Sequence, residues 1–113
     1  MSIREFKISI KPVEAMEKIN NSILGGSISA KLIDHYERVS GEHQVVVFVL
    51  EKYFMRTSNR ASMTVTIDNF DGATKVHAVA SGSSENVFFR FDWGAGNNFA
   101  NSVEQSLVDY MIS

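Results

Sequence analysis

Six consecutive apolar residues, Val45 to Leu50, form the clearest hydrophobic pattern in the chain. Five of them are β-branched or aromatic, and the run is too short to cross a membrane as a helix, so it predicts a β-strand. Successive side chains of a strand point to opposite faces of the sheet, and an unbroken apolar run therefore needs cover on both faces. We expect helices on one face and a second wall, a cavity or a partner subunit on the other.

Alternation of apolar and polar residues predicts further strands on both sides of this run. The alternation that starts at Ser27 slips at Ile33, which indicates a β-bulge. Asn69-Phe70-Asp71-Gly72 has the composition of a hairpin turn, with glycine placed for a positive φ. The predicted strands cover residues 6–10, from 27 to a turn at 40–42, 43–55, 61–68, 74–81 and 86–93.

Two segments have helical spacing instead. From Pro12 to Leu24, apolar residues recur every three or four positions, with proline in the first turn and Gly25-Gly26 expected to end the helix in the left-handed cap conformation. A second helix is predicted from an asparagine cap at Asn97 or Asn98 to Met111. Its apolar stripe consists of Phe99, Val103, Leu107, Tyr110 and Met111.

The order of these elements predicts an α+β fold in a single domain over residues 1–113. We expect an antiparallel meander of five or six strands, with the N-terminal and the C-terminal helix packed on one face. At 113 residues the chain is long enough to bury roughly two-thirds of its unfolded surface.

Composition excludes several classes of protein. The net charge is −2 and the eleven Lys and Arg residues are scattered, so we expect no nucleic-acid partner. The absence of cysteine excludes disulfides, thiol nucleophiles and thiolate metal sites, and no cofactor is expected. No stretch has the length of a membrane span or the apolar core of a secretion signal. We therefore expect no membrane contact and a cytoplasmic location.

Two short motifs resemble chemical sites, and each has a simpler structural explanation. The segment Gly94-Ala95-Gly96 before a helix is similar to a phosphate loop, but Phe99 replaces the third glycine and a tight turn explains it better. His35 and Glu37 share one strand face, yet a metal site needs a third ligand, such as His43 or His77. No serine lies in a nucleophile elbow.

The segment Arg90-Phe91-Asp92-Trp93 alternates charged and aromatic side chains. Such aromatic side chains stack on bases in RNA-binding sheets, but the acidic composition disfavours this use. The aromatic rings of this strand either fill the core or line a pocket for a small ligand.

The stretch Phe88-Phe89-Arg90-Phe91-Asp92-Trp93-Gly94-Ala95, after Ala80-Ser81-Gly82-Ser83, resembles a small bacterial family of domains of unknown function. This resemblance covers most of the chain and transfers no functional residue. In the order of its elements, the chain is also similar to a reduced helix-grip fold, in which a curved sheet wraps a C-terminal helix. That similarity implies an apolar ligand between sheet and helix, although a fold alone does not fix a function.

Three hypotheses for function follow from these patterns. The first is a non-enzymatic domain that binds a small apolar ligand between the sheet and the C-terminal helix. The second is a structural domain that forms a homodimer through the second face of the 45–50 strand. The third is an enzyme, which we rank last because no spacing requires a catalytic site. Candidate ligand-binding residues are Phe48, Leu50, His77, Phe89, Arg90, Phe91, Trp93 and Tyr110, with Arg90 or His77 orienting a polar end.

Overall fold

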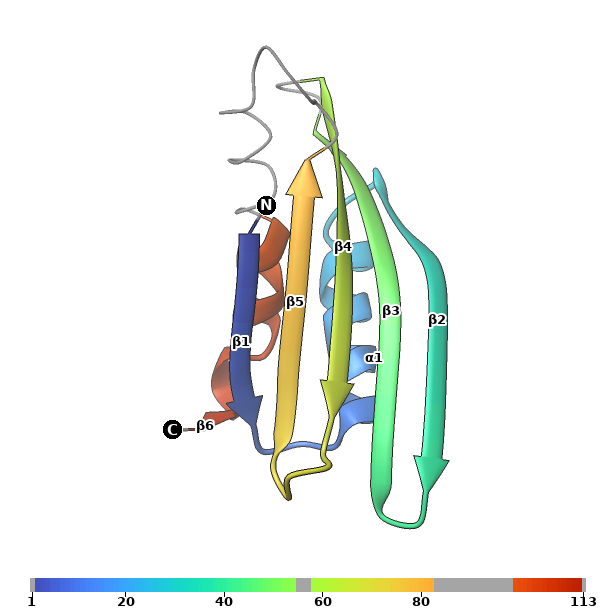
Figure 1. Cartoon of the computed structure of the whole chain (residues 1–113). Coiled ribbons are helices and arrows are strands. Elements are labelled where there is room, and N and C mark those ends of the chain that lie inside the picture. Colours follow the sequence, from blue (N-terminus) through green and yellow to red (C-terminus); the bar gives the residue numbers. More distant parts are fainter. Residues whose placement is uncertain (1, 55–57, 83–98, 113) are drawn as a thin grey trace.

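The computed structural model describes residues 2–54, 58–82 and 99–112. Within these ranges it shows an antiparallel sheet of six strands and helices packed against it (Figure 1). The predicted α+β class and the antiparallel sheet are therefore confirmed. The strands are β1 (Ser2–Ile8), β2 (Ala30–Ser40), β3 (His43–Phe54), β4 (Asn59–Asp68), β5 (Thr74–Gly82) and β6 (Met111–Ile112); the helices are α1 (Pro12–Gly25), residues 99–106 and the 3₁₀-helix η1 (Val108–Tyr110).

Strands β2 to β5 lie side by side in chain order, whereas β1 and β6 do not follow the meander. β1 pairs with β5, and β6 pairs with β1, which gives the order β2-β3-β4-β5-β1-β6. Gly41 between β2 and β3 has a φ of 61°, and Gly72 between β4 and β5 has a φ of 94°, so both turns use a conformation that glycine adopts at little cost. In the described chain β2 is an edge strand, and β3 is its one neighbour.

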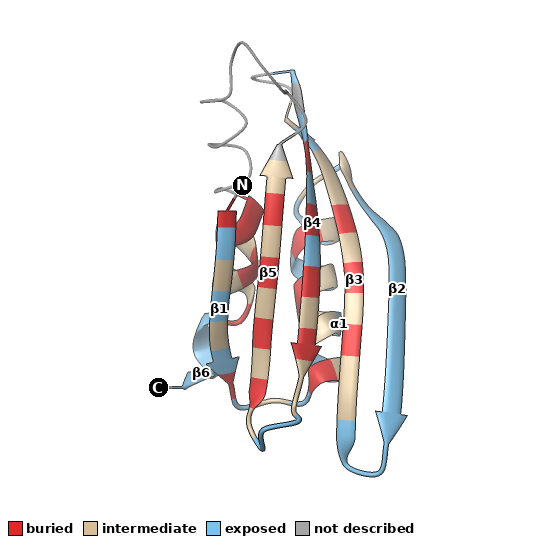
Figure 2. Cartoon of the chain, viewed as in Figure 1, coloured by how far each residue is buried: buried red, intermediate tan, exposed pale blue. Residues whose placement is uncertain are grey.

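The hydrophobic core lies on one face of the sheet. Phe48 and Leu50 of β3 are 0 % exposed, and so is Ile19 of α1, which contacts β2, β3 and β4. Figure 2 shows the period of two as alternating buried and intermediate bands along β3 and β5. The predicted inward positions of β4 and β5 are all buried: Ala61, Met63, Val65, Ile67, Val76, Ala78 and Ala80.

Helix α1 begins at Pro12 as predicted, because the first turn tolerates a missing N–H. The prediction of a left-handed glycine cap is wrong, since Gly26 has φ −96° and ψ 0°. Its N–H instead donates to the carbonyl oxygen of Ser22 at 3.1 Å, and a Cβ at position 26 would lie 3.0 Å from that oxygen. Glycine at this position therefore permits a close approach of backbone to backbone.

The C-terminal helix ends before the predicted Met111. Residues 99–106 are α-helical, η1 follows, and Met111–Ile112 form β6 beside β1. Helical spacing does not reveal this ending, because the ending depends on contacts with distant residues. β6 pairs with β1, and the Ser9 N–H donates to the Tyr110 carbonyl oxygen at 2.9 Å. The buried stripe that remains is Phe99, Ala100, Val103 and Leu107.

Strand β2 begins at Ala30, and Ile28 is fully exposed, so the predicted start at residue 27 is too early. The bulge predicted at Ile33 is confirmed, because the register with β3 shifts between Leu32 and Asp34. The predicted strand over residues 86–93 and the glycine motif at 94–96 lie outside the described residues.

Candidate functional site

The two faces of β3 differ in cover. Val46, Phe48 and Leu50 are 0 % exposed on the core side, whereas Val45 and Val47 alternate with them and are half-buried on the opposite side. We call this opposite side of the sheet the open face. Among the described residues, the apolar run is therefore fully covered on the core side and only partly covered on the opposite side.

Strand register arranges the open face in rows. On this face β3 and β4 present valine and threonine side chains. The half formed by β5 and β1 carries His77 and Glu5 besides Val79 and Ile3, and we call it the charged half. One row runs Tyr36, Val47, Thr66, His77 and Glu5, and the next runs Asp34, Val49, Thr64, Val79 and Ile3.

The charged half contains a defined pair. His77 Nδ1 lies 2.9 Å from Glu5 Oε2, across the β5–β1 ladder. The hydrogen bond from His77 has the largest effect and lowers the pKa of Glu5; desolvation opposes it, and the positive charge of Lys75 lowers the pKa further. Both side chains are exposed, so this pair contributes little to the free energy of folding.

The second unusual feature is the free edge, by which we mean residues 31–40 of β2. Every one of these residues is exposed, including the large apolar side chains of Ile33, Tyr36 and Val39. The Nη1 of Arg38 donates to the Tyr36 hydroxyl at 2.9 Å. Within the described ranges, by contrast, no hydrogen bond or ion pair engages the side chains of Asp34, His35 or Glu37.

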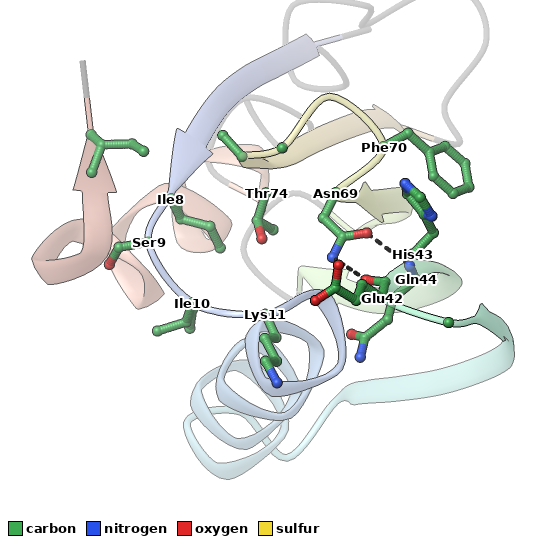
Figure 3. A pocket seen from close by; sticks show the side chains of 14 residues that line it. Ile8, Ser9, Ile10, Lys11, Glu42, His43, Gln44, Asn69, Phe70 and Thr74 are labelled. Atoms are coloured by element: carbon green, nitrogen blue, oxygen red, sulfur yellow. Dashed lines mark hydrogen bonds between the residues drawn. The ribbon is translucent and has the colours of Figure 1, made fainter.

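A third feature is an open pocket at the end of the sheet where α1 begins, which we call the end pocket (Figure 3). Its volume is about 820 Å³. Three connections supply most of its wall: residues 9–11 before α1, residues 41–44 at the β2–β3 turn, and residues 69, 70 and 72–74 at the β4–β5 turn.

Asn69 holds two of these connections together, as the dashed lines in Figure 3 show. Its Oδ1 accepts the backbone N–H of Gln44 at 2.7 Å, and its Nδ2 donates to the carbonyl oxygen of Glu42 at 2.9 Å. The rings of His43 and Phe70 lie 5.7 Å apart between centroids. The wall is therefore fixed by hydrogen bonds and a ring contact at one side.

The end pocket carries few ionisable groups. Among its described wall residues these are Lys11, Glu42 and His43. No three His, Asp or Glu side chains of the described chain lie close enough together to hold a metal ion.

The structure separates the predicted ligand-binding residues. Phe48 and Leu50 are core residues, whereas His77 lies on the open face, so these three side chains cannot line one pocket. Tyr110 is half-buried in η1, with Lys18 Nζ 5.1 Å from its ring centroid. Phe89, Arg90, Phe91 and Trp93 lie outside the described residues.

A smaller pocket of about 380 Å³ lies between the end of α1 and the C-terminal helix. Its described wall is mostly polar and includes Ser22, Lys52 and Gln105; of the predicted ligand-binding residues within the described ranges, none lines it.

Two groups of residues escaped the sequence analysis. The sequence predicts a turn at Asn69, but the hydrogen bonds from its side chain to another turn have no signal in sequence. The free edge does have a signal in sequence, because charge on both faces of a strand is typical of an edge. One face carries His35 and Glu37, and the other carries Asp34 and Arg38. His35 and Glu37 do share a face, as predicted, but His77 lies on the other face of the sheet.

These observations define the class of the protein as an α+β domain with an antiparallel sheet, one covered face and an exposed edge strand. The chain belongs to a family of unknown function, DUF6054, whose model matches residues 1–111. The expectation of a family without assigned function is thus confirmed, while the similarity to helix-grip folds stays a prediction. No curated protein and no solved structure matches the chain. No helix in the described ranges is long and apolar enough to span a membrane.

Proposed function

We propose that this domain is a non-enzymatic structural module that forms a homo-oligomer through the part of the sheet its helices leave uncovered. The observation that carries the proposal is the position of β2 and the outer side of β3. The core side of the sheet is filled by side chains, whereas Val45, Val47 and Tyr36 form an apolar strip on the open face beside an edge with which no other described strand pairs.

Two physical arguments support self-association. Contiguous exposed apolar surface on a protein commonly marks an interaction site. An edge strand also presents a row of backbone N–H and C=O groups that pair readily with another strand, and β2 is eleven residues long. A second copy of the chain is present wherever the protein is present, so it is always available as a partner.

The oligomeric state tests the proposal directly. Light scattering coupled to size-exclusion chromatography and sedimentation equilibrium should show a dimer or higher oligomer whose fraction rises with concentration. A protein that stays monomeric up to the millimolar range contradicts the proposal, because an interface weaker than that provides only about 4 kcal/mol.

A second candidate function is binding of a small polar molecule in the end pocket, and the volume and polar wall of that pocket favour it. A thermal-shift screen of small polar compounds tests it. Compounds that bind there should lose their shift in Lys11→Gln and His43→Ala but keep it in Lys31→Gln, which changes an exposed side chain of β2. Equal shifts in all three variants contradict binding at this pocket.

The apolar ligand expected between the sheet and the C-terminal helix remains a third proposal. Fatty acids and small aromatic compounds in the same screen test it, with native mass spectrometry as the direct readout. The 0 % exposure of Phe48 and Leu50 argues against their direct contact with such a ligand.

A further inference from the structure

The free edge has a charge sequence that is complementary to itself. Around Tyr36, the order Asp34, His35, Glu37, Arg38 places an acid two residues before the tyrosine and a base two residues after it. One residue away the order is reversed, with His35 before Tyr36 and Glu37 after it. A strand that meets its own copy in antiparallel orientation about Tyr36 therefore brings unlike groups together.

We infer that β2 pairs with β2 of a second copy in antiparallel register about a two-fold axis at Tyr36, so that the two sheets become one. This inference rests on the proposed function, and it names the surface and the register by which the copies associate. Asp34 lies opposite Arg38 of the second copy, and His35 lies opposite Glu37 of the second copy. The two-fold axis repeats each of these pairs.

Both faces of the sheet take part. Asp34 and Arg38 pair in register with Val49 and Val45, and therefore lie on the open face. His35 and Glu37 pair with Phe48 and Val46, and therefore lie on the core side. Residues directly opposite each other on antiparallel strands have Cβ atoms about 5 Å apart, close enough for an ion pair or a hydrogen bond.

Neighbouring registers lack this complementarity. A shift of two residues in one direction places Glu37 opposite Glu37 of the second copy, and a shift in the other direction places His35 opposite His35. A shift of one residue reverses the faces, so the helices of the two copies would lie on opposite sides of the joined sheet. The charge order thus selects one register.

The apolar side chains of the edge fit the same arrangement. Tyr36 meets Tyr36 of the second copy at the axis, and Ile33 lies opposite Val39 at each end. These three side chains are 53–58 % exposed in the single chain, so pairing removes apolar surface from water. The bulge at Ile33 interrupts the ladder there, which limits the paired segment.

A disulfide trap tests the register. The chain has no cysteine, so Tyr36→Cys introduces a single thiol at the axis, where opposite Cα atoms lie about 4.5–5.5 Å apart, within disulfide range. Val39→Cys is the matched control, because Val39 is equally exposed but would lie about 20 Å from its counterpart. Under mild oxidation Tyr36→Cys should form a covalent dimer rapidly, and Val39→Cys should not.

Charge reversal provides a second test. Asp34→Arg and Arg38→Asp each turn two attractive pairs into repulsive ones, so each variant alone should raise the dissociation constant about tenfold or more. A mixture of the two variants should form a heterodimer, because both pairs are then complementary again. Asp109→Arg, the same charge change on η1, is the control and should leave association unchanged.

The outcomes separate the two proposals. An oligomer that ignores both reversals, or that cross-links equally well through positions 36 and 39, overturns the pairing of β2 and leaves self-association standing. A wild-type chain that is monomeric throughout overturns both. Circular dichroism of each variant should match the wild type, since every substituted position is exposed.

Discussion

Val47 and Phe48 are adjacent in the chain and have opposite surroundings. Phe48 is 0 % exposed in the core, while Val47 is half-buried on the open face beside Tyr36 and Thr66. Both belong to one apolar run, so hydrophobicity alone does not distinguish them. The strand period of two does distinguish them, since it assigns neighbouring side chains to different faces.

Truncation of these two side chains should have unequal effects. Phe48→Ala removes a fully buried ring and leaves a cavity, and should lower the free energy of unfolding by about 3–5 kcal/mol. Val47→Ala should cost about 1 kcal/mol or less, because its side chain is only partly buried. Urea denaturation followed by circular dichroism measures both losses of unfolding free energy. Equal losses would contradict the assignment of Phe48 to the core and Val47 to the open face.

The Glu5–His77 pair predicts a pH effect with a definite sign. Because the pKa of Glu5 is lowered in the folded state, its contribution is present at neutral pH and is lost as the pH falls below about 4, where the unfolded carboxylate also takes up a proton. Glu5→Gln should therefore weaken the dependence of stability on pH in this range. The effect should be small, because the pair is exposed.

Thermal unfolding between neutral pH and about pH 3 measures this dependence. Asp109→Asn is a suitable control, since its side chain makes no ion pair with a described residue. A variant Glu5→Gln with an unchanged slope on the acid side would show that the pair does not act in solution.

At the scale of elements, turn residues predicted the hairpins well and helix ends poorly. Gly41 and Gly72 have positive φ, as hairpin turns require, and the chemistry of glycine makes this visible in sequence. Gly26 instead permits a close approach to the Ser22 carbonyl oxygen, and Met111 and Ile112 pair with β1 and do not extend the helix. Such endings depend on neighbours that the local pattern does not contain.

The adjacent glycines at the end of α1 provide a matched pair. Gly25→Ala meets nothing within 4 Å and should be neutral or stabilise the helix by up to about 1 kcal/mol. Gly26→Ala places its Cβ 3.0 Å from the Ser22 carbonyl oxygen, so the backbone must shift and stability should fall. Thermal denaturation of both variants tests this. An equal change in melting temperature would show that the close approach of position 26 to the Ser22 carbonyl oxygen does not affect stability.

At the scale of the whole molecule, the sheet is asymmetric. Among the described residues, helical residues fill one side of the sheet, and the other side and one edge carry exposed apolar and charged residues. Electrostatic pairing along β2 and apolar packing through the open face respond oppositely to salt, which separates these two modes of association.

If β2 pairs through its charges, association should weaken as sodium chloride rises from about 0.1 to 1 M, because the Debye length falls from about 10 to 3 Å. Association through Val45 and Val47 should persist or strengthen, particularly in sulfate. Sedimentation equilibrium over this series decides between them, with Asp34→Arg as the control whose salt dependence should reverse, because salt screens its two repulsive pairs.

The sequence by itself determined much of the local structure of this protein: strands β2 to β5, the bulge at Ile33, the hairpin turns and the start of α1. Each depends on side-chain period or turn chemistry within a few residues, and these act in any context. The tertiary structure alone decided which face of β3 is covered, which strand lies at the edge, and where the C-terminal helix ends. Those choices depend on contacts between segments far apart in the chain, such as β1 with β5, and no local pattern records them.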